Sequence, residues 1–422
     1  MSKLGWVDFS SEDREQVSKI LAMLKEPGTL DELGIGQIRD AFADLLFPGF
    51  STVQTRAKYL ILVPTILKEY HHLNVKQPIL EYLKEREDEV AKLLDIHHPS
   101  STEGIIGRTM VNKDGVAKRP SSVYWNAFRQ FEIIHTFMSL NEFSQKYSKI
   151  IFQVNSTQEH DEGIDESSAL REAILTPNGY SSNWLEEVTL DLNYDEADFL
   201  YRKMTTSSYV KDSVSTQLFL SGLMQEALEQ YTALQKNKEH LDFDNSLDLL
   251  EDLVLRSNDI SKECAETLTL ANEFSLAMEG PHIRYNIVLA TKENYENEEL
   301  AEHYKTLYKI WEVTVKKRKT FSSGCSTRWL QAAKREHSRA FNDKTVGFIE
   351  KWSVLMQSGA NDEVLDDLVK HQALTNKGKR SILHKNIQHA GWVGIRRLDY
   401  RWSSAVKILQ DIVDGLNNDS TK

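Results

Sequence analysis

The segment from residue 34 to residue 64 constrains the fold most, because it joins two helical patterns across a sharp corner. Before the corner, apolar residues recur every three or four positions, which predicts a helix with one buried stripe. Pro48 and Gly49 interrupt the pattern, and beyond them Tyr59–Val63 is apolar on every side of a helix. We expect the second helix to be buried among others, with Pro64 kinking or ending it. The stripe residues are Ile38, Phe42, Leu45 and Leu46.

Two arginines flank this corner and can be interpreted in two ways. Ser51 and the glutamine three residues after it have the pattern of a capping box, so a helix is expected to open at Ser51. A helix N-terminus attracts anions, and nearby arginines add positive charge. One interpretation is that Arg39 and Arg56 pair with Asp40, Asp44 or the carboxyl ends of helices. The other is that Arg39, Ser51 and Arg56 form an anion-binding site.

The rest of the chain also has mainly helical patterns. Few segments alternate as strands do, and only 8 of the 422 residues are proline. This length is too great for one small core, so two to three helical subdomains are expected. The last helix, from about residue 399, carries an apolar stripe that could cover Tyr59–Val63. We predict an all-α, multi-helix globular protein whose N- and C-terminal parts pack together.

Two internal helices have features that bear on structure or function. One is expected from Ile260 to Met278, followed by a turn that contains Gly280 and Pro281. The other follows Ser121 and is rich in aromatic residues. The helical spacing of these aromatic residues favours a place in the core over a base-stacking platform. They are Tyr124, Trp125, Phe128, Phe131 and Phe137.

Charge is divided unevenly along the chain, whose formal net charge is −12. Residues 1–150 are close to neutral, whereas residues 151–310 hold 12 basic and 31 acidic residues. Residues 311–411 hold 19 basic and 10 acidic residues. We therefore predict an N-terminal helical subdomain (1–150), an acidic middle helical subdomain (151–310) and a basic C-terminal helical subdomain (311–422). Such asymmetry bears more on binding partners than on fold.

The basic C-terminal part contains cations interleaved with Trp392, Tyr400 and Trp402. Lysine and arginine neutralise phosphates, and aromatic rings stack on bases, so this pattern suits nucleic acid. Alternatively, the aromatic residues belong to the core, and the cations form a solvated face or dock on the acidic middle part. The candidate nucleic-acid-binding residues are Lys377, Lys379, Arg380, Lys385, Arg396, Arg397 and Arg401.

No catalytic or nucleotide-binding motif has the spacing that its chemistry requires. No lysine has an acidic residue two positions before it, and the chain lacks a P-loop, an H-E-x-x-H pair and a G-x-S-x-G elbow. Histidine pairs at 71–72 and 97–98 are adjacent residues, which point in different directions on a helix and suit a solvated face better than a metal. We therefore expect no metal and no cofactor, and we assign no catalytic residue.

The cysteine content and the hydropathy indicate a compartment. The two cysteines, Cys264 and Cys325, are far apart in sequence, which argues for a reducing cytosol and against a disulfide framework. The first residues lack the apolar core of a signal peptide, and no run of 18 apolar residues exists. We expect a cytoplasmic protein without a membrane partner.

Several blocks resemble a known family. The chain opens with WVDFS at residues 6–10, and residues 32–59 read ELGIGQIRDAFADLLFPGFSTVQTRAKY. These blocks resemble the W-[VI]-D-F-S start and the G-[IL]-G-x-I-R-D-A-F-A-D-x-L-F-P-G-x-S-T-x-Q-T-R-A block of an uncharacterised bacterial family, a domain of unknown function. Arg284–Asn286 and Leu398–Trp402 are also similar to it. Genes of that family tend to lie in phage-defence islands beside helicase, nuclease or phospholipase-D-like genes. No catalytic residue can be carried over from the resemblance, because none is assigned in that family.

These observations lead to three functional hypotheses. The first is a non-catalytic binding or scaffold subunit of a prokaryotic multi-gene anti-phage defence system, acting on foreign DNA with a helicase or nuclease partner. The second is a protein-interaction module that uses the acidic middle part. The third is a nuclease-like enzyme with a non-standard active site, whose candidate residues are Arg39, Asp40, Asp44 and Arg56.

Overall fold

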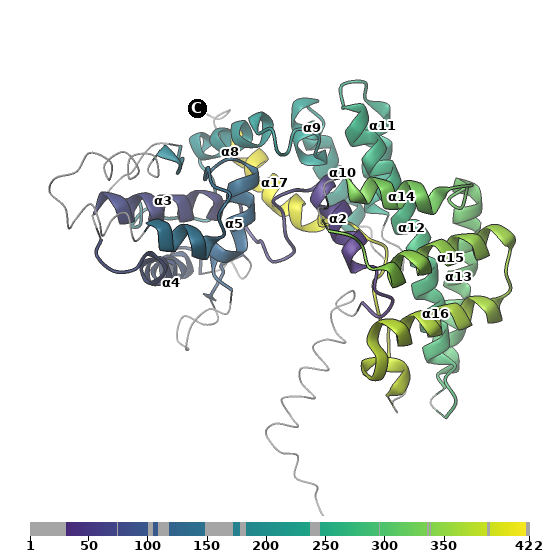
Figure 1. The fold of residues 1–422 in the computed structure, drawn as a ribbon. Helices are drawn as coiled ribbons and strands as arrows, with labels where there is room; N and C mark the ends of the chain where they lie inside the picture. The colour runs from purple at the N-terminus through teal and green to yellow at the C-terminus, as the bar shows by residue number, and fades with distance from the viewer. Residues whose placement is uncertain are drawn as a thin grey trace, which may run out of the picture. The chain divides into compact units, whose positions relative to one another are not determined.

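The regular structure of this protein is helical. The computed structural model describes residues 31–73, 75–99, 104–108, 118–147, 172–177, 183–236, 245–294, 296–335, 337, 339–385 and 389–418. Across these ranges no strand forms, and the strand-like pairing is an isolated antiparallel bridge between Ile134 and Ile174. The predicted all-α fold is therefore confirmed (Figure 1). The WVDFS block at residues 6–10 lies outside the described residues.

The chain forms two compact units that alternate along the sequence. Unit 1 comprises residues 1–42, 239–245 and 267–399, and unit 2 comprises residues 43–238, 246–266 and 400–422. Two of the boundaries fall inside helices, one in α2 (Gly36–Leu46) and one in α12 (Lys262–Ala290). This division differs from the contiguous parts predicted at 1–150, 151–310 and 311–422. Those parts were drawn from charge, which describes surfaces and does not report which segments share a core.

Unit 2 contains the apolar run predicted to be buried. Tyr59–Val63 opens α3 (Tyr59–His72), and all of its residues are buried. Two helices, α4 (Ile79–His97) and α5 (Pro120–Gln130), pack against α3, and Figure 1 shows the three close together. Pro64 lies within α3 and does not end it, because the helix continues to His72. The other helices of unit 2 are α8 (Tyr194–Thr206), α9 (Val214–Leu220), α10 (Met224–Lys236), α11 (Ser246–Arg256) and α17 (Trp402–Asn417).

Segments from the two ends of the chain meet within unit 2. The ring of Phe47 stacks on that of Trp402 with centroids 5.5 Å apart. Nearby, the Arg401 guanidinium donates to the Asp44 carboxylate at 2.7 Å. The terminal helix α17 also packs along α8. The prediction that N- and C-terminal parts pack together is therefore confirmed.

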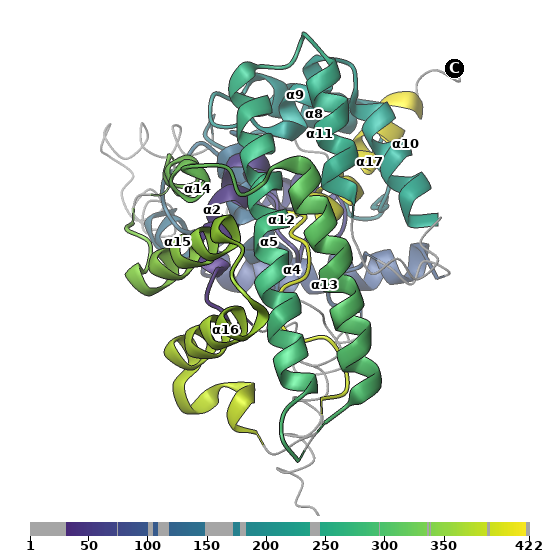
Figure 2. The same ribbon diagram turned by 90° about the vertical axis from the view of Figure 1, so that its right-hand side faces the viewer.

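Unit 1 is organised around the part of α12 that begins at Thr267. Three buried tryptophans approach it from three different helices, and each donates its indole N–H to a residue of α12. Trp311 donates to the Leu276 carbonyl at 2.7 Å, and Figure 2 shows its helix alongside α12. The other helices of unit 1 are α13 (Glu298–Arg318), α14 (Cys325–Lys334), α15 (Asp343–Ser358) and α16 (Asp362–Lys377), followed by the short 3₁₀ helices η2 (Gly378–Arg380) and η3 (Ile382–His384).

The turn predicted at Gly280 and Pro281 was wrong, because α12 continues through both residues to Ala290. Proline has no N–H, so the carbonyl four residues before it, that of Ala277, loses its helical donor. The indole N–H of Trp352 donates to this carbonyl at 3.2 Å. A side chain from α15 thus replaces the hydrogen bond that Pro281 cannot make, and the helix is preserved.

An irregular segment, residues 389–399, is held along α12 by polar side chains. Asn286 donates to the Val393 carbonyl at 2.8 Å and accepts from the N–H of Val393 at 2.8 Å. Ser275 binds both backbone groups of Leu398, at 2.7 and 3.0 Å. These buried side chains satisfy backbone groups that no helix or sheet satisfies.

Candidate nucleic-acid interface

The basic segment at the carboxyl end of α16 displays exposed cations, and Glu32 anchors its backbone. We use this name for residues 377–385, which include Lys377, Lys379, Arg380 and Lys385. Lys377 is half-buried, and the other three cations are exposed. The buried carboxylate of Glu32 fixes the middle of the segment, since it accepts from the Ser381 hydroxyl at 3.0 Å and from a backbone N–H at 3.3 Å. The cations are therefore displayed on a backbone that is already ordered.

Among the described residues, no carboxylate pairs with the four cations of the basic segment. A fifth cation, Lys292, donates to the Lys385 carbonyl at 2.6 Å and so adds charge to the same place. Part of this charge complements the carboxyl end of α16, where cations are favourable. The rest remains available to an external anion.

Arg396 is another exposed cation of unit 1, outside the basic segment. Its guanidinium carbon lies 5.2 Å from the ring centroid of Trp392, in a cation–π arrangement. The indole N–H of Trp392 donates to the Gly394 carbonyl at 3.1 Å. This pair combines positive charge with a planar surface, both of which suit a phosphate-linked base.

Two of the predicted nucleic-acid-binding residues, Arg397 and Arg401, serve other contacts. Arg397 is 8 % exposed and donates to Asn272 at 2.9 Å, so it holds residues 389–399 on α12. Arg401 belongs to unit 2, where it binds Asp44 and donates to the Phe50 carbonyl at 3.0 Å. The aromatic neighbours Tyr400 and Trp402 are buried. They are core residues, as the alternative interpretation proposed.

Arg56 binds an anion that the protein itself supplies. Its Nε donates to the Asp411 carboxylate at 2.9 Å, and a terminal nitrogen donates to Asp191 at 2.9 Å. The N–H of Ala57 also donates to Asp411, at 2.8 Å. Burial raises the pKa of Asp411, and the bonds from Arg56 and Ala57 oppose that rise. Arg56 is therefore paired within unit 2, and its partners are Asp411 of α17 and Asp191 and not the predicted Asp40, Asp44 or helix carboxyl ends.

Ser51 does not open a helix, so the predicted N-terminal anion site is wrong in its geometry. The Gln54 side chain accepts from the Ser51 N–H at 3.1 Å, which forms half of a capping box. The helix α3 nevertheless begins only at Tyr59. The reason lies in the intervening residues, because the N–H of Arg56 donates to the Tyr124 hydroxyl at 3.1 Å and cannot enter a helical pattern.

The residues of the nuclease-like alternative have separate partners. Arg39 pairs with its neighbour Asp40 on α2 at 2.9 Å, whereas Asp44 and Arg56 make the ion pairs described above. Among the described residues, no group of three or more histidine, cysteine, aspartate or glutamate side chains could hold a metal ion. Both cysteines are buried as free thiols.

Sequence reasoning missed an aromatic pocket in unit 2. The aromatic helix α5 ends at Gln130, and Tyr124, Trp125 and Phe128 are buried as predicted. Phe137 lies beyond the helix and is 83 % exposed. Its polar neighbours, His135 and Thr136, are the one signal in the sequence that sets it apart from the core aromatics.

Comparison with known proteins places the chain in a family. Residues 1–415 match the model of a family of unknown function (DUF6361). The chain belongs to this family. Membership confirms the prediction that the chain belongs to a family of unknown function, and it carries no assigned activity. Neither the curated proteins nor the solved structures give a match. No helix in the described part of the chain is long and apolar enough to cross a membrane.

Proposed function

We propose that this protein is a non-catalytic subunit that binds the phosphates of DNA through the basic segment. The observation that carries the proposal is the set of four cations in that segment, anchored by Glu32 and without an ion pair among the described residues. Cations that a fold leaves unneutralised on an ordered surface are suited to phosphate contacts, which release counterions from DNA.

The contrast with the other arginines supports this assignment. Arg56, Arg401 and Arg284 each bind carboxylates of their own unit and stabilise the fold. Arg284, for example, is 3 % exposed and pairs with Asp366 at 2.7 Å. Over the described ranges of unit 1, the cations of the basic segment form no ion pair of this kind.

A binding subunit of this kind would act on DNA together with an enzyme. We propose that the partner is a helicase or nuclease of a multi-gene anti-phage defence system, as the gene neighbourhoods of the family suggest. Co-purification of the chain from its native operon, followed by mass spectrometry and detection of bound DNA, tests this step. Recovery of the chain without any such enzyme and without DNA would contradict it.

Substitution of three cations tests the DNA contact itself. The triple variant Lys377→Ala, Lys379→Ala and Arg380→Ala should bind a DNA duplex more weakly, to the same extent for every sequence, because phosphate contacts carry no sequence information. Its thermal melt should not change, since exposed charges contribute only about 0–1 kcal/mol per pair.

A matched control separates a local contact from the effect of net charge. The triple variant Lys309→Ala, Lys344→Ala and Lys351→Ala removes the same charge from exposed positions of unit 1. It should bind DNA as the parent does. Equal weakening of DNA binding in both variants would show that net charge, and not a local contact of the basic segment, determines the affinity. Unchanged DNA binding with lower stability in the first variant would show that the segment docks on acidic protein surfaces instead.

A further inference from the structure

The aromatic pocket of unit 2 is built on a loop that is fixed by hydrogen bonds on both sides. Directly after α5, the N–H groups of Ile133 and Ile134 donate to the Phe128 carbonyl at 2.8 and 3.0 Å. His135 donates its N–H to the Ala173 carbonyl at 2.8 Å. Beyond Phe137, the Met138 carbonyl accepts from the Trp125 indole at 3.0 Å. Phe137 therefore projects from an ordered backbone.

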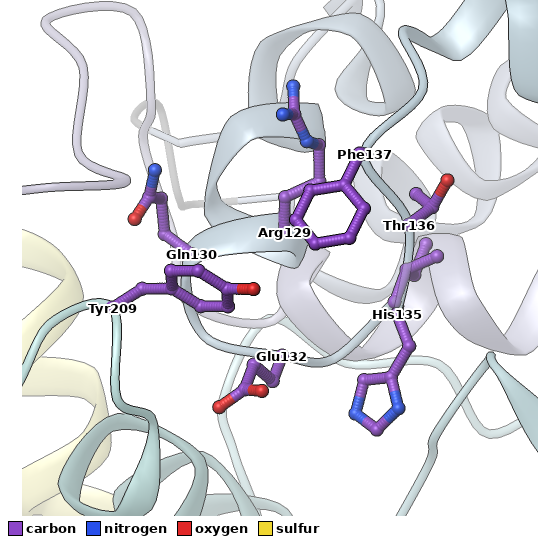
Figure 3. A pocket seen from close by; sticks show the side chains of 8 residues that line it. Arg129, Gln130, Glu132, His135, Thr136, Phe137 and Tyr209 are labelled. Atoms are coloured by element: carbon purple, nitrogen blue, oxygen red, sulfur yellow. The ribbon is translucent and has the colours of Figure 1, made fainter.

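The segment that carries Tyr209 forms the second wall of the pocket, and it is hydrogen-bonded to the end of α5. The Ser207 hydroxyl donates to the Gln130 carbonyl at 2.7 Å, and the N–H of Tyr209 donates to the same hydroxyl at 3.3 Å. Tyr209 is 52 % exposed. Figure 3 shows the Tyr209 and Phe137 rings projecting from separate segments toward a common hollow, with Glu132 below them. Two large aromatic side chains are thus held apart and exposed, although burial would stabilise each.

Polar groups line the same hollow, whose volume is about 180 Å³. Glu132 has a φ of +51°, a left-handed conformation that is uncommon for a glutamate and is found more often at binding sites. Gln130 offers both a donor and an acceptor. The Nε of Arg129 is buried and has no hydrogen-bond partner among the described residues. Pockets for drug-sized ligands have volumes of roughly 300–1,000 Å³, so this smaller hollow suits a single ring system.

We propose that this hollow binds a nucleobase that carries an exocyclic amino group. The flat faces of the base would contact the Phe137 and Tyr209 rings, and its amino group would donate to the Glu132 carboxylate, which can only accept. Ring nitrogens and carbonyls of the base would accept from the amide of Gln130 and from the terminal N–H groups of Arg129, whose Nε is covered. The inference goes beyond the proposed function, because base binding here needs neither phosphate nor the basic segment.

A base fits this set of groups better than an aromatic side chain from a protein partner. A phenylalanine or tryptophan ring could occupy the space between the two aromatic residues. It would bring at most one donor and no ring acceptor, so the N–H donors of Gln130 and Arg129 would gain no partner while losing water. A base with an amino group supplies both donors and acceptors around one flat ring.

Saturation-transfer NMR with uncharged nucleosides tests the inference on the full chain. Cytidine, adenosine and guanosine should bind, and uridine, which lacks an amino group, should bind more weakly. Phe137→Ala and Tyr209→Ala should each weaken binding by about tenfold, as expected for loss of a base–aromatic contact. Glu132→Gln should remove the preference for amino-bearing nucleosides over uridine.

Two control variants make the outcome decisive. Tyr194→Ala removes another exposed aromatic ring of unit 2 and should leave nucleoside binding unchanged. The triple variant of Lys377, Lys379 and Arg380 should also bind nucleosides normally, so that failure of DNA binding and failure of base binding are distinguishable. Absence of nucleoside binding, binding unaffected by Phe137→Ala, or binding of N-acetyltryptophanamide in place of nucleosides would overturn the inference.

Discussion

The packing of α13 on α12 predicts a large penalty for adding a single methyl group at Gly280. A Cβ atom at this position would lie 2.3 Å from two atoms of the Trp311 ring, far inside the usual carbon–carbon contact of about 3.5–4.0 Å. Trp311 cannot easily withdraw, because it is buried and donates to the Leu276 carbonyl at 2.7 Å.

The magnitude of the Gly280→Ala effect follows from three contributions. Overpacking costs about 1–3 kcal/mol, and the upper end applies here because the obstacle is a pinned ring. Displacement of Trp311 from its hydrogen bond costs about 1 kcal/mol more. The higher helix propensity of alanine offsets about 1 kcal/mol of this destabilisation. The free energy of unfolding should therefore fall by about 3 kcal/mol.

Urea unfolding measures this change, and the chain offers a matched control. Gly347 is also inside a helix, α15, but a Cβ there would meet nothing within 4 Å. Gly347→Ala should therefore stabilise the protein by about 0.5–1 kcal/mol. The nearest atoms to Gly280 belong to the six-membered part of the indole, which phenylalanine does not reach. In a Trp311→Phe background, Gly280→Ala should cost about 2 kcal/mol less than in the parent. Equal effects of Gly280→Ala and Gly347→Ala would refute this account of the packing.

Three further predictions concern unit 2 and the alternative function. Burial raises the pKa of Glu87 from 4.5 to about 7, so the folded state binds more protons than the unfolded state between these values, and this contribution to stability is lost as pH rises. The stability of Glu87→Gln relative to the parent should therefore rise by roughly 3 kcal/mol from pH 4.5 to pH 8. Urea unfolding at several pH values measures this rise, and a difference that does not change with pH would contradict the raised pKa of Glu87. Asp411→Asn should lower the free energy of unfolding by about 3 kcal/mol, because Arg56 loses its main partner; an unchanged urea midpoint would argue against this. Purified protein with Mg²⁺ or Mn²⁺ should not cleave DNA, and cleavage abolished by Asp40→Ala or Asp44→Ala would instead support the nuclease-like alternative.

Much of the helical architecture could be predicted from local patterns. Periodicity located the α2 stripe, and the apolar run Tyr59–Val63 correctly implied a buried helix. The errors arose where a distant side chain decided the local structure. The Trp352 indole donates to the carbonyl that Pro281 leaves without a donor. Tyr124 and Asp411 accept from the N–H groups of Arg56 and Ala57, within the helix that Ser51 was expected to open. None of these contacts is visible in the neighbouring sequence.

The sequence predicted a cluster of cations in the C-terminal part, but only some of the predicted residues lie in the basic segment. Residue type alone could not separate Lys379 and Arg380, which are exposed, from Arg397 and Arg401, which stabilise their units. That distinction depends on whether a carboxylate or amide lies within reach in three dimensions. Phe137 was grouped with core aromatics for the same reason, since helical spacing does not reveal where a helix ends.

The dependence of DNA affinity on salt tests the central claim most directly. Filter-binding titrations at three or more salt concentrations give the slope of log affinity against log salt, which changes by about 0.9 for each phosphate contact on a DNA duplex. If Lys377, Lys379 and Arg380 each contact a phosphate, their joint replacement by alanine should flatten the slope by about three units. Parallel lines for the parent and the triple variant would contradict the claim that this segment binds DNA.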